Sequence, residues 1–291
     1  MESVRPRRSV LFMPGVNARA MEKARELPAD GLVFDLEDSV PPDAKVAART
    51  QIAAAIARGG YGRREKILRV NGSATQWHRD DLAFGATLPV DAVLLPKVNS
   101  DEDARAASDA LDAAGAPGHL AIWCMIETPL GVLAAAPIAG ASPRLAALVA
   151  GTEDLAKDLR ARPRPDRLPF LAALEICVLA ARAHGLVPLD AVYPDFADGE
   201  GFAAQCRQGR DLGFAGKTLI HPSQIAPANA AFGPSADELA QARRIVAAFE
   251  AAAQGDRAVA ALDGKMIEKL HVDEARRLLA LADAIASLHA P

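Results

Sequence analysis

The feature that most constrains the fold is a regular alternation of short apolar segments with longer segments that favour helix. Several of the short segments are continuously apolar, as in Val93-Leu94-Leu95, which is typical of strands covered on both faces. The short segments span residues 9–13, 31–36, 66–70, 92–96, 120–126, 146–150, 190–193 and 217–220. We therefore expect eight parallel strands joined by helices.

The intervening segments carry helix signals. Residues 18–27, 42–58, 100–114 and 170–184 favour helix, and Gly185 supplies a helix stop. Eight strand–helix units over about 225 residues predict a (β/α)8 TIM barrel. The alternative is an open doubly wound sheet, which usually carries a glycine-rich phosphate loop after its first strand. The sequence contains neither GxGxxG nor GxxxxGK[ST], so the barrel is favoured.

The last part of the chain departs from this repeat. Ser235 and Glu238 form a capping-box pattern that opens a helix to about Gln254. The segment 259–269 contains the turn signal Asp263-Gly264, and 273–288 has the pattern of an amphipathic helix. We therefore expect a barrel domain over residues 1–254 and a C-terminal lid and helix over residues 255–291.

Composition narrows the possible function classes. The 291 residues carry a net charge of −4, with 51% hydrophobic and 24% charged residues, which excludes a disordered chain. The mild acidity argues against nucleic acid as a partner, and no apolar run is long enough for a membrane span or a secretory signal. Three cysteines without CxxC spacing argue against a disulfide framework. We expect a cytoplasmic protein that binds small molecules.

Charged side chains gather after the predicted strands, where barrel enzymes place their chemistry. Arg69 ends the third strand, and carboxylates follow the second, fifth, sixth and seventh strands. These carboxylates are Asp35, Glu37, Asp38, Glu127, Glu153, Asp154 and Asp195. Carboxylates that converge on one mouth repel each other unless a cation lies between them, and Mg²⁺ favours one or two carboxylates with water and substrate oxygens. Because His221 is the one imidazole at these strand ends, zinc is disfavoured.

Each of these residues also has a structural interpretation. Glu127 and Asp154 could cap helices, and Arg69 could be a buried ion-pair partner of the acids. Lys97 could be a solvated side chain, a phosphate ligand or a base, whereas His221 is better explained as structural. Because side chains alternate along a strand, the acids at positions 35, 37 and 38 cannot all point inward, so at least one of them is expected to be structural.

At these residues the sequence resembles the citrate lyase β-subunit-like branch of the HpcH/HpaI aldolase superfamily, which includes malyl-CoA and citramalyl-CoA lyases. The similarity runs from residue 7 to about residue 277, and the order and spacing of the matching segments carry it. These segments are RSVLFMPG (8–15), FDLEDSV (34–40), RVN (69–71), LPK (95–97), IETPLG (126–131), GTED (151–154), DFADGEGF (195–202) and GKTLIHPSQ (216–224).

The resemblance implies a (β/α)8 barrel, Mg²⁺ and an acyl-thioester of coenzyme A as substrate. It assigns Glu127 and Asp154 as metal ligands and Arg69 to the carboxylate and oxygen of a bound keto acid. Glu37 and Asp38 would hold metal-bound waters. The residues that correspond to coenzyme A contacts are Phe12, Lys23 and Arg19.

The C-terminal segment Asp263-Gly-Lys-Met-Ile-Glu268 resembles the lid of the family's stand-alone lyases. In those relatives the lid comes from a neighbouring subunit and places an Asp at the active site, which implies a homotrimer or a dimer of trimers here. Glu268 stands at that position and keeps the carboxylate with one more methylene. The resemblance therefore implies a catalytic role for Glu268 together with Arg69.

The function expected from the resemblance is Mg²⁺-dependent carbon–carbon cleavage of a citramalyl-, malyl- or citryl-CoA-like substrate, which yields an α-keto acid and acetyl-CoA. Two alternatives share the same site. One is a malyl-CoA-type thioesterase, which adds water to the thioester. The other is a citrate lyase β subunit that depends on a carrier protein. The sequence leaves the acyl group open, because a single methyl changes discrimination by only about 1–3 kcal/mol.

Overall fold

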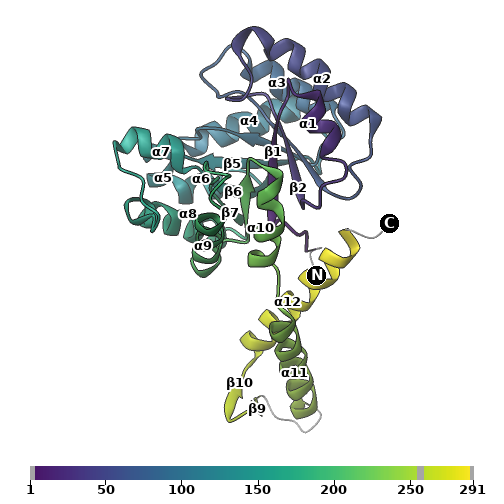
Figure 1. Cartoon of the computed structure of the whole chain (residues 1–291), viewed down its shortest axis with the longest axis vertical. Helices are drawn as coiled ribbons and strands as arrows, with labels where there is room; N and C mark the ends of the chain where they lie inside the picture. Colours follow the sequence, from purple (N-terminus) through teal and green to yellow (C-terminus); the bar gives the residue numbers. More distant parts are fainter. Residues whose placement is uncertain (1–3, 254–258, 289–291) are drawn as a thin grey trace. The chain divides into compact units, whose positions relative to one another are not determined.

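A computed structural model describes residues 4–253 and 259–288 and divides the chain into two compact units. The larger unit is Arg7–Phe232, and the described residues of the smaller unit are 4–6, 233–253 and 259–288. Figure 1 shows the larger unit as a ring of strands surrounded by helices, and the smaller one as two long helices with a short hairpin.

The larger unit is a closed parallel barrel in which each strand pairs with its neighbours in sequence and β1 pairs with β8. The predicted (β/α)8 TIM barrel is thus confirmed. Its strands are β1 (Ser9–Pro14), β2 (Gly31–Asp35), β3 (Glu65–Arg69), β4 (Ala92–Leu95), β5 (Ala121–Ile126), β6 (Leu145–Ala150), β7 (Val187–Asp190) and β8 (Gly216–Leu219).

The helices that cover this barrel lie between successive strands, except the last, which follows β8 (Figure 1). They are α1 (Ala18–Lys23), α2 (Lys45–Arg58), α3 (His78–Thr87), α4 (Asp101–Ala113), α5 (Pro129–Leu133), α6 (Ala135–Ala139), α7 (Thr152–Leu159), α8 (Leu171–Ala183), α9 (Gly199–Asp211) and α10 (Ile225–Phe232). Three 3₁₀ turns lie at Pro42–Ala44, Leu168–Phe170 and Pro222–Gln224.

Two apolar layers hold the barrel together. The larger layer lies between the strands and the helices. The inner layer consists of alternate strand residues, among them Val33, Ile67, Trp123 and Met125, which pack inside the barrel. Because strand side chains alternate with a period of two, the next inward positions along these strands open onto the carboxyl ends. This alternation decides which polar side chains can reach the mouth.

The predicted seventh strand, 190–193, was wrong. The strand is Val187–Asp190, and it places Leu189 in the inner layer. Asp190 points into the outer layer, where it pairs with Arg167 (2.6 Å) and with the fully buried Lys217 (3.0 Å). The apolar run 191–193 resembles a strand more closely than the true strand does, because Pro188 interrupts the latter. Asp195 therefore lies in an exposed turn beyond β7, where its side chain accepts from the N–H of Ala197.

The smaller unit packs α11 (Ala236–Ala253) against α12 (Lys269–Leu288) and the hairpin of β9 (Ala260–Leu262) and β10 (Lys265–Ile267). Its small core includes Ile267 and Val272. The predicted domain boundary at residues 254 and 255 lies outside the described residues. The described contacts place α11 with the C-terminal elements rather than with the barrel. Among the described helices, none is long and apolar enough to cross a membrane.

Where β8 pairs with β1 to close the barrel, the backbone at Gly216 lies very close to the backbone at Arg7. A Cβ added at Gly216 would lie 1.8 Å from the carbonyl oxygen of Arg7. We expect Gly216→Ala to destabilise the barrel by about 1–3 kcal/mol through overpacking. A loss of this size lowers the midpoint of thermal unfolding by about 2–4 °C per kcal/mol. Gly118→Ala is the matched control, because nothing lies within 4 Å of its added Cβ. Equal midpoints for the two variants would contradict this account.

Candidate active site at the barrel mouth

Four polar or aromatic side chains reach the mouth because they continue the inward alternation of their strands. Phe12 follows Val10 on β1, and Asp35 and Arg69 end β2 and β3 at paired positions. Glu127 lies two residues after Met125 of the inner layer. The barrel therefore brings together Phe12, Arg69 and Glu127, which are far apart in the sequence and which the sequence analysis selected.

Arg69 is held in a fixed position by Asp35. Its Nε and Nη2 donate to the two carboxylate oxygens at 2.6 and 2.7 Å, and both side chains are almost completely buried. Burial alone would raise the pKa of Asp35, but the adjacent guanidinium brings it below its ordinary value. The Phe12 ring lies under the guanidinium, with 4.8 Å from the Arg69 Cζ to the ring centroid. Asp35 is thus the structural acid among the three, and Arg69 retains N–H groups for a ligand.

Glu37 and Asp38 lie in the turn after β2 and differ in burial. The Glu37 carboxylate is 9% exposed and lies 2.9 Å from Arg69 Nη1, whereas the Asp38 carboxylate is 64% exposed and 3.9 Å from the same atom. Burial raises the pKa of Glu37, partly offset by Arg69. Lys45 supports the turn from below, since its buried ammonium donates to the carbonyls of Leu36 and Glu37, each at 2.8 Å.

Glu127 is a buried carboxylate with one firm partner. Its Oε1 accepts from the backbone N–H of Lys97 at 2.8 Å. Burial raises the pKa of Glu127 to about 7, against the opposing effect of Lys97. The Glu127 side chain occupies the space beside Gly151. A Cβ added at Gly151 would lie 2.7 Å from Glu127 Oε2, so a larger residue at this position would clash with the carboxylate. A bound cation would offset the cost of keeping this carboxylate charged.

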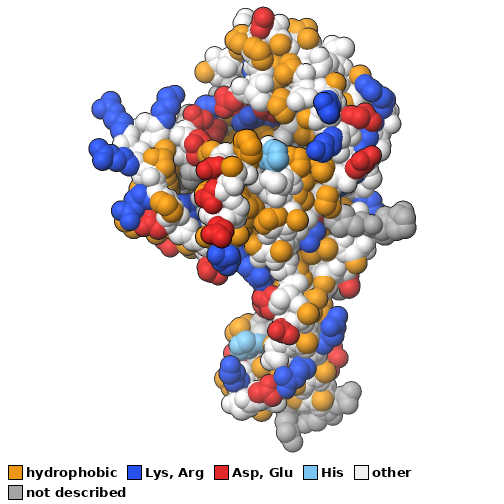
Figure 2. Space-filling view, in the orientation of Figure 1, with side chains coloured by type: hydrophobic (Ala, Val, Ile, Leu, Met, Phe, Trp, Pro, Cys, Tyr) orange, Lys and Arg blue, Asp and Glu red, His pale blue; other side chains and the backbone are white. Residues whose placement is uncertain are grey.

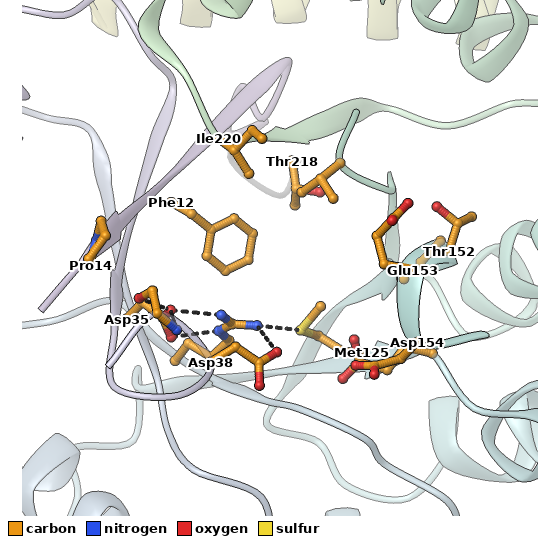
Figure 3. A pocket seen from close by; sticks show the side chains of 16 residues that line it. Phe12, Pro14, Asp35, Asp38, Met125, Thr152, Glu153, Asp154, Thr218 and Ile220 are labelled. Carbon is orange, nitrogen blue, oxygen red and sulfur yellow. Dashed lines mark hydrogen bonds and ion pairs between the residues drawn. The ribbon is translucent and has the colours of Figure 1, made fainter. Parts of the chain in front are cut away.

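Among the polar and aromatic side chains described above, five line a cavity of about 430 Å³ at the carboxyl ends of the strands: Phe12, Asp35, Asp38, Arg69 and Glu127. In Figure 3, Phe12 and Asp35 lie on one side of it, and Thr152, Glu153 and Asp154 from the start of α7 lie on the other. Carboxylates outnumber basic groups in its lining, which contains one arginine, Arg69, and the acids Asp35, Asp38, Glu127, Glu153 and Asp154.

The donor set fits a magnesium ion. Across residues 4–253 and 259–288, no cluster of three or more His, Cys, Asp or Glu side chains is arranged to hold a metal. Mg²⁺, however, is commonly bound through one or two carboxylates, with water and substrate oxygens completing its shell. Glu127 and Asp154 line the same acidic cavity, and the second oxygen of Glu127 has no hydrogen bond among the described contacts. Both residues are therefore suited to hold the ion.

The remaining predicted residues lie outside the cavity lining. Arg19 and Lys23 are exposed on α1, which follows β1. Glu268 belongs to the smaller unit, where it is half-buried between β10 and α12, and its role at the barrel stays a prediction. His221 accepts from the N–H of Ser223 at the start of a 3₁₀ turn, and its ring stacks on Phe196.

The structure places two lysines beside the site: Lys45, to which sequence reasoning gave no role, and Lys97, to which it gave no single role. Lys45 had no signal, because its partners are backbone carbonyls. Lys97 was left open between several roles, and its Nζ contacts Glu37 at 2.7 Å and Asp154 at 3.2 Å. Burial alone would lower the pKa of Lys97, but the hydrogen bond and charge of Glu37 raise it above its ordinary value.

The outer surface near the mouth also carries charge. Figure 2 shows Lys and Arg side chains gathered over α7 and the loop after it. The exposed residues of this segment include Lys157, Arg160 and Arg162. This face lies on the opposite end of α7 from Asp154 and contributes no side chain to the cavity lining.

Together, the closed barrel and the acidic mouth with its anchored arginine are typical of a TIM-barrel enzyme. The chain belongs to the HpcH/HpaI aldolase/citrate lyase family, which residues 8–222 match. It is 51% identical over 285 residues, 98% of each chain, to a (3S)-malyl-CoA thioesterase of Cereibacter sphaeroides strain KD131. It is 37% identical to the citrate lyase subunit beta of Escherichia coli K12, over 96% of this chain and 94% of the relative.

A solved structure agrees with the fold. The protein CitE from Mycobacterium tuberculosis, in complex with magnesium, acetoacetate and coenzyme A, superposes with a TM-score of 0.73 at 30% identity. The match covers 94% of this chain and 97% of that one.

The Asp35–Arg69 pair gives a test of how the site is supported. We expect Asp35→Asn to cost about 3 kcal/mol, because it leaves a buried guanidinium without its main counter-charge. Asp38→Asn is the control, with a change expected within about 0.5 kcal/mol, since that carboxylate is mostly exposed. Urea unfolding measures both values.

The same pair predicts a pH dependence. Because the pKa of Asp35 is lowered on folding, its contribution is complete above the ordinary carboxyl pKa of about 4 and is lost as the pH falls below it. The wild-type protein should therefore lose more stability on acidification than Asp35→Asn. Parallel losses in the two proteins would contradict the assignment.

Proposed function

We propose that this protein is a hydrolase for thioesters of coenzyme A with a short 3-hydroxy-carboxyacyl group, of the malyl-CoA type. The observation that carries the proposal is the anchored Arg69 opposite the Glu127 and Asp154 carboxylates in one cavity. This arrangement suits an acyl group with both a carboxylate and a hydroxyl. The thioesterase relatives, at 49–51% identity over 98% of the chain, favour hydrolysis over carbon–carbon cleavage.

In this proposal Arg69 binds the carboxylate end of the acyl group. Two of its N–H groups are committed to Asp35, so the planar guanidinium is already oriented and loses little freedom on binding. Glu127 and Asp154 would hold Mg²⁺, and Glu37 and Asp38 would accept hydrogen bonds from water bound there. The bound ion would act as a Lewis acid and a template for the carboxylate and hydroxyl oxygens.

Hydrolysis then requires water to attack the thioester carbonyl. A carbon–oxygen bond forms, the carbon–sulfur bond breaks, and one proton passes from the water to the departing thiolate of coenzyme A. We propose Glu268 of the C-terminal lid as the carboxylate that takes this proton, with the lid supplied by a neighbouring copy in a homotrimer or a dimer of trimers. Phe12, Arg19 and Lys23 are the proposed contacts for coenzyme A, as the resemblance to the family implies. Phe12 lies on β1, and Arg19 and Lys23 lie on α1.

Carbon–carbon cleavage to an α-keto acid and acetyl-CoA is the second candidate. The same Arg69 and carboxylates would bind the keto acid, and Glu268 would protonate the acetyl-CoA enolate. The 37% identity to a citrate lyase subunit beta supports this candidate, and it also keeps a carrier-protein-dependent subunit as a third possibility.

Product analysis separates the two reactions. With malyl-CoA and Mg²⁺, we expect free malate and coenzyme A in equal amounts, measured by chromatography and a thiol assay. Acetyl-CoA and glyoxylate as the main products would assign the lyase instead. No turnover of any coenzyme A thioester, together with capture of an acyl-carrier protein, would support the carrier-protein-dependent subunit.

The metal assignment predicts the effect of one conservative change. We expect Glu127→Gln to lower Mg²⁺-dependent turnover at least about 100-fold, because removal of a ligand or of its orientation commonly costs this much. Titration calorimetry with MgCl₂ should show loss of binding. Arg105→Gln, on the exposed face of α4, is the control for folding and assay. Unchanged Mg²⁺ binding by Glu127→Gln would exclude it as a ligand.

The lid assignment is tested at its carboxylate. Glu268→Gln should retain Mg²⁺ binding and keto acid binding but lose turnover, since the amide cannot accept the proton. Mixing it with Glu127→Gln should restore part of the activity if the lid acts between subunits. Full turnover by Glu268→Gln alone would remove the lid from the mechanism.

A further inference from the structure

Lys97 has an unusual backbone conformation at the edge of the site. It follows β4 directly after Pro96, and its φ of 52° lies in the left-handed region that a residue with a side chain seldom adopts. This conformation aims its N–H at Glu127 Oε1, 2.8 Å away. A strained residue in a cavity wall is a candidate for a functional role.

The side chain of Lys97 contacts Asp154, the second proposed metal ligand. Lys97 Nζ lies 3.2 Å from Asp154 Oδ2, 2.7 Å from Glu37 Oε1 and 3.7 Å from Asp38 Oδ1. Lys97 therefore contacts Glu127 through its backbone and Asp154 through its ammonium. The carboxylates of Glu37, Asp38 and Asp154 lie around Nζ. Carboxylate oxygens are also the ligands that a small hard cation prefers.

We propose that the Lys97 ammonium is a resident counter-ion, which occupies the cation position beside Asp154 and leaves it when Mg²⁺ binds. This inference rests on the proposed ligand pair of Glu127 and Asp154. The backbone N–H of Lys97 stays on Glu127, so this carboxylate keeps its orientation while Asp154 exchanges one cation for another. Lys97 is thus a positioning residue that keeps the acidic mouth folded before the metal arrives.

The structure provides space for the released ammonium. A second cavity of about 540 Å³ adjoins the first, and Lys97 lines it together with Glu37, Asn71, Asn99 and Thr128. The Lys97 side chain is 36% exposed, and its stem is flexible, so rotation toward this cavity is open to it. Glu37 borders the same cavity, and the ammonium can therefore keep this partner while it leaves Asp154.

Removing a competing cation should tighten metal binding, whereas removing a structural support should weaken it. We expect Lys97→Met to bind Mg²⁺ about tenfold more tightly than the wild-type protein, which corresponds to the release of one partly exposed ion pair. Lys97→Gln should show the same direction, and it serves if the Met variant does not fold. Lys157→Met, an exposed lysine on α7, is the matched control with unchanged affinity.

Titration calorimetry with MgCl₂ measures these affinities, and a crystal structure of the wild-type protein with MgCl₂ measures the Lys97 Nζ to Asp154 distance. Tighter binding together with a distance beyond 4 Å is the expected result. Equal or weaker binding by both variants, or an ammonium still on Asp154 beside a bound metal, overturns the inference. If one of these contrary results is found while the wild-type protein binds Mg²⁺ and Glu127→Gln does not, the role of Lys97 is rejected and the assignment of Glu127 as a ligand is kept. If the wild-type protein binds no Mg²⁺, the ligand pair fails and the inference fails with it.

Discussion

The paired hydrogen bonds between Asp35 and Arg69 organise the mouth of this barrel. They join the last residues of two adjacent strands whose register sets them side by side, and they orient a guanidinium that would otherwise swing freely. The Phe12 ring lies against one face of the guanidinium, and Glu37 contacts its far edge. This fixed cation forms part of the wall of the acidic cavity.

The excess of carboxylate around the cavity explains why lysines border it. Lys45 secures the turn that carries Glu37 through backbone carbonyls, and Lys97 joins Glu37 to Asp154. Each lysine lowers the cost of holding acids close together in the folded protein, which is large for unpaired buried charges. A magnesium ion at Glu127 and Asp154 would offset the negative charge in the same way. The lysines would then supply one part of the positive charge and the bound ion the other.

Much of the fold was predictable because continuous apolar runs mark strands covered on both faces. The prediction failed at β7, where Pro188 divides the run and the buried Asp190 serves ion pairs with Arg167 and Lys217 that no local pattern reveals. In the site, Arg69 and Glu127 followed from the rule that chemistry lies at strand ends. Which of the three acids at the end of β2 and in the turn after it is structural depends on the alternation of side chains along the strand and on Arg69. The Lys97 contacts depend on a left-handed backbone that no residue type there signals.

Gly151 shows that a missing side chain can be part of a site. It begins the turn from β6 into α7, and Glu127 of the neighbouring strand occupies the volume that any Cβ there would take. The position of the Glu127 carboxylate after β5 therefore depends on the absence of a side chain at Gly151 after β6. In a comparison of barrels of this kind, a larger residue at this position would mark a rearranged carboxylate even where every charged residue of the site is retained.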